Sequence, residues 1–194
     1  MRILLLTHPM SFEEKLLGVY QTIPPLGITY IASSLEKDGH EVKILDCFAE
    51  GLHTKKWKDG SIRQGLLDEE ILKRVKDFGP QIVGISNNFT HFFEDAYSLA
   101  KLIKENFPNV FVMAGGNHMT LEYESVMKRP HIDLIVRGEG EYLVNEVVER
   151  YTHKKSFEGI AGIVWRKIDG TVVLNEIGHP PEDLDKIPFP AYHL

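Results

Sequence analysis

The chain of 194 residues has little cysteine, no long apolar run and no excess of positive charge. Its single cysteine, Cys47, excludes an intrachain disulfide and an iron–sulfur cluster held by this chain's own thiolates. No run approaches the ~20 apolar residues of a membrane-spanning helix, and the opening run at residues 3–6 is too short for a signal peptide. A net charge of -6 gives no basic face for nucleic acid. We expect a cytoplasmic protein with neither membrane nor nucleic acid as a partner.

The chain does have a regular alternation of strand and helix signals. Apolar runs suited to strands buried on both faces occur at residues 2–7, 40–46, 81–86, 110–114 and 133–136. Helical patterns follow them at about residues 24–37, 67–78, 92–106, 119–127 and 141–151. These units predict an α/β fold of the flavodoxin-like type, with a doubly wound parallel five-stranded sheet in the order 2-1-3-4-5. Residues 47–66 and the stretch before the first helix carry no pattern and are expected to be loops.

The pattern changes after residue 152. Asp169-Gly170 separates two β-prone runs and predicts a C-terminal β-hairpin within residues 160–175. Residues 178–194 are rich in proline and predict an extended connector. We therefore divide the chain into a Rossmann-like domain at residues 1–152, a hairpin extension at 153–177 and a connector at 178–194.

Small polar residues and glycines stand where the third and fourth predicted strands end, which is where open parallel sheets bind ligands. The third strand is followed by Ser86, Asn87 and Asn88, which can hydrogen-bond a ligand or simply cap a helix. The fourth is followed by Gly115, Gly116, Asn117 and His118. The glycines let a large ligand approach the backbone, or turn a strand tightly into a helix. No second metal ligand stands at a metal-site spacing from His118, so we expect no metal site.

The fifth predicted strand ends in Arg137, Gly138 and Glu139, followed by Glu141. Glu141 stands at the start of the following predicted helix, where a carboxylate stabilises the helix through its dipole. The role of Glu139 stays open. Two familiar folds fit poorly. A phosphoacceptor receiver domain needs carboxylates where Thr7-His8 and Ser86-Asn87 stand, and a flavodoxin needs a loop richer in hydroxyls after its first strand.

Several segments together carry a more specific resemblance. They are Pro24-Pro-Leu-Gly-Ile-Thr-Tyr-Ile-Ala-Ser-Ser-Leu35, Val83-Gly-Ile-Ser86, Ala114-Gly-Gly-Asn-His-Met-Thr120, Val136-Arg-Gly-Glu-Gly-Glu141, Ile160-Ala-Gly-Ile163 and Asp183-Leu-Asp-Lys-Ile-Pro-Phe-Pro190. In this order the chain resembles the N-terminal cobalamin-binding domain of cobalamin-dependent radical SAM proteins. That group includes the anaerobic Mg-protoporphyrin ester cyclase-like enzymes and many methyltransferases.

The resemblance implies that this chain is part of a longer protein. In the family, a radical SAM barrel follows the last of these segments and holds a 4Fe-4S cluster and S-adenosylmethionine. We expect the barrel and a small-molecule substrate as partners of this domain. The intact enzyme would transfer a methyl group or carry out ring-forming or rearrangement chemistry. The chain by itself, which ends at Leu194, should perform no radical chemistry.

The resemblance also implies a mode of cobalamin binding. The loop Thr7-His-Pro-Met-Ser-Phe12 lacks the Asp-x-His-x-x-Gly motif that supplies a histidine to cobalt in related domains, so we expect base-off binding without histidine ligation. His8 is kept as a weak candidate to approach the cobalt. The expected cofactor-binding residues are Pro25 and Leu26 near the corrin, and Ser86, Asn87, Asn88, Gly115, Gly116, Asn117, His118, Arg137, Gly138 and Glu139 along the nucleotide tail.

Two other functions remain open. The chain is a structural or regulatory module without cobalamin if bulky side chains, such as those of Phe89, Phe92 and Phe93, fill the cleft above the sheet. A stand-alone corrinoid shuttle is the other alternative, although it would lack the proline-rich connector.

Overall fold

The computed structural model describes residues 1–51, 53–56, 60–179 and 183–194. Its centre is a set of parallel strands: β1 (Arg2–Thr7), β3 (Glu41–Asp46), β6 (Ile82–Ser86), β7 (Phe111–Gly115) and β8 (Leu134–Val136). They lie side by side as β3-β1-β6-β7-β8. The side chains of residues 3–6 in β1 are at most 3% exposed. Such continuous burial is typical of a parallel strand covered by helices on both faces.

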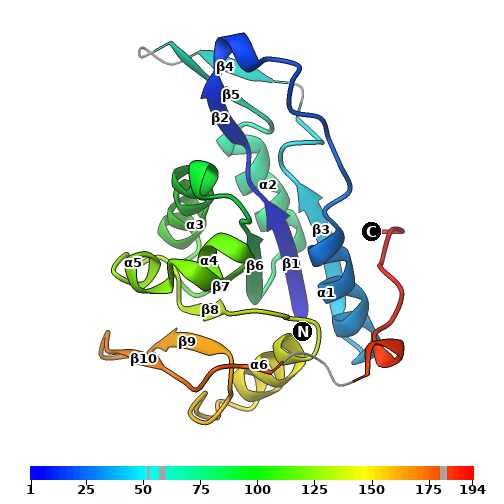
Figure 1. Ribbon diagram of the computed structural model, residues 1–194, viewed down its shortest axis with the longest axis vertical. Coiled ribbons are helices and arrows are strands. Elements are labelled where there is room, and N and C mark those ends of the chain that lie inside the picture. The colour runs from blue at the N-terminus through cyan, green and yellow to red at the C-terminus, as the bar shows by residue number, and fades with distance from the viewer. Residues whose placement is uncertain (52, 57–59, 180–182) are drawn as a thin grey trace.

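Helices cover both faces of this sheet (Figure 1). One face packs against α1 (Leu26–Lys37) and α6 (Leu143–Thr152). The other packs against α2 (Asp68–Phe78), α3 (Phe93–Asn106), α4 (Asn117–Leu121) and α5 (Tyr123–Met127). Successive strand residues alternate between the two cores, so that Leu5 belongs to the α1/α6 side and Leu6 to the other. The predicted α/β architecture is confirmed.

The C-terminal hairpin continues the same sheet instead of standing apart from it. Its strands β9 (Ile163–Arg166) and β10 (Val172–Leu174) are antiparallel to each other, and β9 pairs antiparallel with β8. The complete order is β10-β9-β8-β7-β6-β1-β3, which makes seven strands where the parallel units alone predict five. The boundary that we place at residue 152 therefore cuts between neighbouring strands of one sheet, and stays a prediction.

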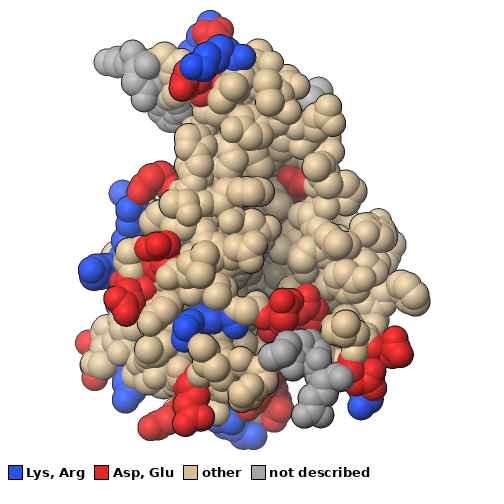
Figure 2. Space-filling model, viewed as in Figure 1, with Lys and Arg blue, Asp and Glu red and all other residues tan. Residues whose placement is uncertain are grey.

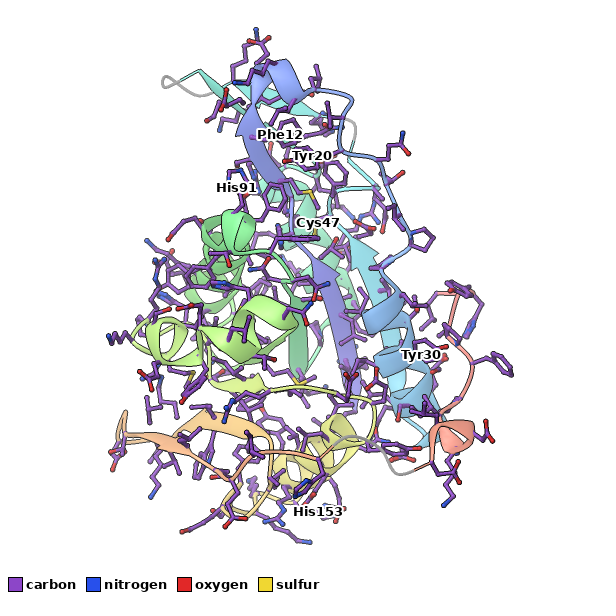
Figure 3. The ribbon with its side chains drawn as sticks, in the orientation of Figure 1. Phe12, Tyr20, Tyr30, Cys47, His91 and His153 are labelled. Carbon is purple, nitrogen blue, oxygen red and sulfur yellow. The ribbon has the colours of Figure 1, made fainter. Side chains whose placement is uncertain are left out.

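A second, smaller sheet occupies segments that we expected to be loops. It consists of β2 (Met10–Glu13), β4 (Thr54–Lys56) and β5 (Ser61–Gln64), in the order β2-β5-β4, with the short helix η1 (Glu14–Leu16) after β2. Phe12 of β2 packs against Tyr20, with ring centroids 4.9 Å apart (Figure 3). Phe92, at the end of the short helix η2 (Thr90–Phe92), completes this core.

The predicted connector is attached to the domain over the part that the structure describes. Residues 183–194 contain the short helix η3 (Leu184–Lys186), and the chain then runs beside α1 (Figure 1). Ala191 is 2% exposed and its N–H donates to the carbonyl of Thr29 at 3.0 Å. The Ser33 hydroxyl donates to the carbonyl of Pro188 at 3.4 Å. Among the helices in the described ranges, none is long and apolar enough to cross a bilayer.

Candidate functional site

A cavity of about 240 Å³ lies between the sheet and the helices α1 and α6, and opens beyond the carboxyl ends of the strands. Figure 2 shows this face hollowed near its middle, with few charged side chains around the upper part of the hollow. The side chains that make the cavity apolar come from the sheet and both helices: Leu5, Met113, Val136, Ile28, Ile31 and Val144.

Two glycines lie in the wall of the cavity and are closely packed by neighbouring side chains. Gly84 in β6 stands between Leu5 of β1 and Met113 of β7 in the sheet register. A Cβ on Gly84 would lie 2.7 Å from Leu5 Cδ2 and 3.4 Å from Met113 Cε. A Cβ on Gly140 would lie 2.7 Å from Ile31 Cδ1. Any larger residue at either position would therefore displace a neighbouring side chain that lines the cavity.

Hydrogen bonds tie together the loops at the cavity mouth. The Asn87 N–H donates to the carbonyl of Gly115 at 2.9 Å. The Asn117 N–H donates to Asn88 Oδ1 at 3.2 Å, and the Gly138 N–H donates to Thr120 Oγ1 at 3.0 Å. The loops after β6, β7 and β8 are thus held to one another before any ligand binds, which lowers the ordering cost of binding.

Gly116 allows the loop after β7 to lie close to the loop after β6. Its φ is +105°, a conformation that L side chains rarely adopt. A Cβ at this position would lie 2.6 Å from the carbonyl oxygen of Asn87. The backbone after β7 can therefore contact the loop after β6 only with glycine at this position.

The structure brings seven of the predicted site residues to this cavity. They are Ser86, Asn88, Gly115, Gly116, Asn117, Gly138 and Glu139. All lie at or just after the carboxyl ends of β6, β7 and β8, where strand-end polar residues and glycines are expected to meet a ligand. Thr120, the last residue of the segment Ala114–Thr120, was not a predicted site residue, but it lines the cavity as well.

The other five predicted site residues are not among those that line the cavity. Pro25 and Leu26 lie at the start of α1, and Leu26 is 51% exposed. Asn87 is 2% exposed, because the alternation that turns Ser86 toward the cavity turns its neighbour away.

His118 lies behind the cavity wall instead of in it. It is 4% exposed, its Nδ1 lies 3.1 Å from Thr90 Oγ1, and its ring packs against Phe93 at a centroid distance of 4.6 Å. Burial lowers the pKa of His118, which favours the neutral ring. His118 therefore links α4 to the short helix η2, which immediately precedes α3.

Arg137 is also directed away from the cavity. Because Val136 faces the cavity, Arg137 faces the opposite side of the sheet, where its guanidinium lies 4.3 Å from the ring centroid of Tyr123. It lines a separate hollow of about 470 Å³ that shares only Gly138 and Glu139 with the cavity.

His8 lies next to Phe92 of the small-sheet core and does not line the cavity. It is 5% exposed, its Nδ1 lies 2.9 Å from the carbonyl oxygen of Pro9, and its ring centroid is 6.1 Å from that of Phe92. Burial is the main cause that lowers the pKa of His8. Within the described ranges, no group of three or more His, Cys, Asp or Glu side chains is placed to hold a metal ion.

The three phenylalanines expected to block the cleft do not line the cavity. Phe92 belongs to the core of the small sheet and Phe93 to the core beneath α3, while Phe89 is 63% exposed. Sequence reasoning missed the apolar lining. Leu5, Met113 and Val144 look like ordinary core residues, and only Gly84, a glycine in the middle of an apolar strand, signals a close approach.

Comparison with known proteins places this geometry in a family. Residues 16–148 match the B12 binding domain family. The chain is 36% identical to cytidylyl-2-hydroxyethylphosphonate methyltransferase of Streptomyces wedmorensis, over 87% of this chain and 36% of that protein. It is 37% identical to an uncharacterized methyltransferase of Pyrococcus horikoshii, over 100% of this chain and 39% of that protein.

Two solved structures share the fold at 19% identity. One is the cobalamin-dependent S-adenosylmethionine radical enzyme OxsB with aqua-cobalamin and S-adenosylmethionine bound, which covers 98% of this chain with a TM-score of 0.71. The other is the radical S-adenosylmethionine methyltransferase TsrM of Kitasatospora setae with cobalamin and an iron–sulfur cluster bound, which covers 90% with a TM-score of 0.67. This chain spans 24% and 30% of those chains.

A further relative, the anaerobic magnesium-protoporphyrin IX monomethyl ester cyclase of Synechocystis, is 30% identical over 86% of this chain and 31% of that protein. The family match covers more than half of the chain, and its relatives are the enzymes that the sequence resemblance predicts. The chain therefore belongs to the B12-binding domain family, together with a methyltransferase and the anaerobic cyclase among its relatives.

Proposed function

We propose that this chain holds cobalamin for a larger radical SAM enzyme, with the nucleotide tail of the cofactor in the cavity between the sheet and helices α1 and α6. The observation that carries the proposal is the hollow beside Gly84, which opens at the carboxyl edge of the sheet. When bound, cobalamin supplies group-transfer chemistry, and the protein supplies its position and surroundings.

The residues present fit such a tail in two respects. An aromatic base suits the apolar part of the cavity, formed by side chains such as Leu5, Met113 and Val144. Ribose hydroxyls and amide groups suit the mouth, where Ser86, Asn117 and other polar residues can exchange hydrogen bonds with them. The hydrogen-bonded loops at the mouth would keep this shape during binding and release.

We infer that the cobalt receives no histidine from this chain. His8 belongs to the segment after β1 that lacks the histidine-ligand motif, and it is enclosed at 5% exposure. To coordinate the cobalt of a bound cobalamin, His8 would have to leave its contacts with Pro9 and Phe92. The burial of His8 supports cobalamin binding without histidine ligation, and a tail held in the cavity would keep its base away from the cobalt, which is the base-off form.

We infer further that the intact protein carries a radical SAM domain with a 4Fe-4S cluster and S-adenosylmethionine, and acts on a small-molecule substrate. This chain spans well under half of the relatives that it matches. Two of them are named methyltransferases, which favours methyl transfer, and the cyclase keeps ring formation as the alternative reaction.

Titration of the chain with hydroxocobalamin tests the binding step. We expect a change in the visible spectrum toward the base-off form and elution of the corrinoid with the protein on gel filtration. His8→Gln should leave the bound spectrum unchanged, and a shifted spectrum would contradict the absence of histidine ligation. No spectral change and no co-elution would overturn the proposal and favour a structural or regulatory role.

A further inference from the structure

The C-terminal segment, residues 186–194, runs beside helix α1, and we call it the strap (Figure 1). Its hydrogen-bond partners in α1 recur every four residues and therefore share one side of the helix: Thr29, Ser33 and Lys37. The Ala191 N–H donates to the carbonyl of Thr29 at 3.0 Å, and Lys37 Nζ donates to the carbonyl of Lys186 at 3.4 Å. The strap is thus attached along the length of α1.

A different side of α1 forms part of the cavity wall. Gly27, Ile28 and Ile31 line the cavity, and all three belong to the N-terminal half of the helix. Ile28 is 6% exposed and shares an apolar core with Ala191 of the strap, which is 2% exposed. The N-terminal half of α1 therefore contacts the cavity on one side and the strap on another.

This half of α1 has few contacts of its own that would hold it in place. Its N-cap is Pro25, no side chain caps its first amides, and no acidic residue stands in its first turn. Leu26 is 51% exposed. The second half is joined to the region of α6 by Ser34, whose hydroxyl donates to the carbonyl of Glu141 and accepts from Asn145 Nδ2 at 3.0 Å. Local opening of α1 is therefore easiest at its N-terminal end.

We propose that α1 couples the cavity to the strap. A ligand in the cavity steadies the N-terminal half of α1 and so keeps the strap docked, and release of the strap weakens ligand binding. The inference rests on the proposed function, because it takes cobalamin as the ligand. In the intact protein, the strap would hold the radical SAM domain that we infer more firmly when the cofactor is present.

The size of the coupling is limited by how firmly the strap docks. Coupling between two sites is reciprocal, so the ligand protects the strap by the same factor by which the docked strap tightens ligand binding. The net contribution of one hydrogen bond, such as that from Ala191 to Thr29, corresponds to about two- to tenfold in an equilibrium constant. We therefore expect a coupling of this order.

Hydrogen exchange at the Ala191 amide, with and without saturating hydroxocobalamin, tests the effect of the ligand on the strap. We expect the exchange to slow by about two- to tenfold on binding. The Gly170 amide, which donates to the carbonyl of Lys167 in the β9–β10 turn, is the control and should exchange at an unchanged rate. Binding without slower exchange at Ala191 would overturn the coupling while leaving the proposed function intact.

Ala191→Asp tests the opposite direction, because it places a charge in a buried position and should release the strap. We expect a rise in the Kd for hydroxocobalamin by the factor found at the Ala191 amide, and faster exchange of the Thr29 amide in the ligand-free chain. Tyr192→Asp adds the same charge to a neighbouring side chain that is 64% exposed, so this matched control should change neither quantity. Ala191→Gly removes only the buried methyl group and serves if the charged variant folds poorly.

The ligand-free comparison keeps the two proposals separate. Unchanged exchange at Thr29 and unchanged affinity in both Ala191 variants would overturn the coupling. Failure of the unmodified chain to bind hydroxocobalamin would overturn the proposed function. Exchange at Thr29 would then still decide whether the strap steadies α1, since that measurement needs no ligand.

Discussion

Replacement of Gly84 by alanine tests whether the nucleotide tail occupies the cavity. The new methyl group would lie 2.7 Å from Leu5 Cδ2 and 3.4 Å from Met113 Cε. Both are the ends of flexible side chains, and both face the open cavity. In the free protein they can move into that space, so we expect the variant to fold. In the complex the space is filled, and the methyl group then competes with the tail.

The magnitude follows from the cost of overpacking. An extra methylene in a filled core costs about 1–3 kcal/mol, which corresponds to roughly a five- to 150-fold increase in Kd. The free energy of unfolding of the ligand-free protein should fall by less than this, because Leu5 and Met113 have room to relax. Isothermal titration with hydroxocobalamin gives the affinity, and urea unfolding gives the free energy of unfolding.

Two controls separate a filled cavity from a damaged fold. Cobinamide has no tail, so its affinity should be the same for Gly84→Ala and the unmodified chain. Gly27 of helix α1 also lines the cavity, but its added methyl group meets no atom within 4 Å, so Gly27→Ala should raise stability by up to about 1 kcal/mol. If folded Gly84→Ala binds hydroxocobalamin as tightly as the unmodified chain, the tail does not lie beside Gly84 and the reasoning is refuted.

Three further predictions concern the mouth of the cavity and the buried histidines. Gly116→Ala should lower the free energy of unfolding by about 1–3 kcal/mol in urea, because its φ of +105° disfavours a side chain; an unchanged value would contradict the close approach of the loops. Thr120→Val removes the acceptor for the Gly138 N–H and should cost about 1 kcal/mol, whereas Thr120→Ser should retain most of that stability. Burial lowers the pKa of His8 and His118 below 6.5, so the unfolded chain binds protons more readily. Their contribution to stability is complete above about pH 6.5 and declines as the pH falls below it. Urea unfolding at pH 7.5 and 5.5 checks this sign, and a flat profile would contradict it.

The large sheet was predictable because each of its parallel strands is a continuous apolar run followed by an amphipathic helix. The small sheet was not, since its strands are short and β4 (Thr54–Lys56) exposes all of its side chains. Its stability comes from Phe12 and Phe92, which are far apart in the chain and meet only in the folded state. Local periodicity carries no record of such a contact.

The candidate site divides in the same way. Glycine, asparagine and serine at the strand ends stand out against apolar neighbours, so residues such as Asn88 and Gly116 could be predicted to reach the cavity mouth. The orientation of Arg137 follows from the alternation of side chains along β8, but only once it is known that Val136 points into the cavity. Leu5 and Met113 could not be recognised as cavity residues. A buried strand residue has the same apolar sequence pattern whether its side chain faces a helix or a cavity.

Gly84 helps to decide between a cofactor domain and a structural module. A glycine inside a strand costs about 0.5–1 kcal/mol relative to alanine, and it forfeits the packing of a side chain. Here it lies in a central strand, between Leu5 and Met113, where a larger residue would displace these two side chains, which line the cavity. A module whose only role is to pack against another domain gains nothing from that hollow. The phenylalanines considered as blocks do not fill it: Phe92 and Phe93 belong to other cores, and Phe89 is 63% exposed. The stability given up at Gly84 is therefore best explained by a ligand that takes the space.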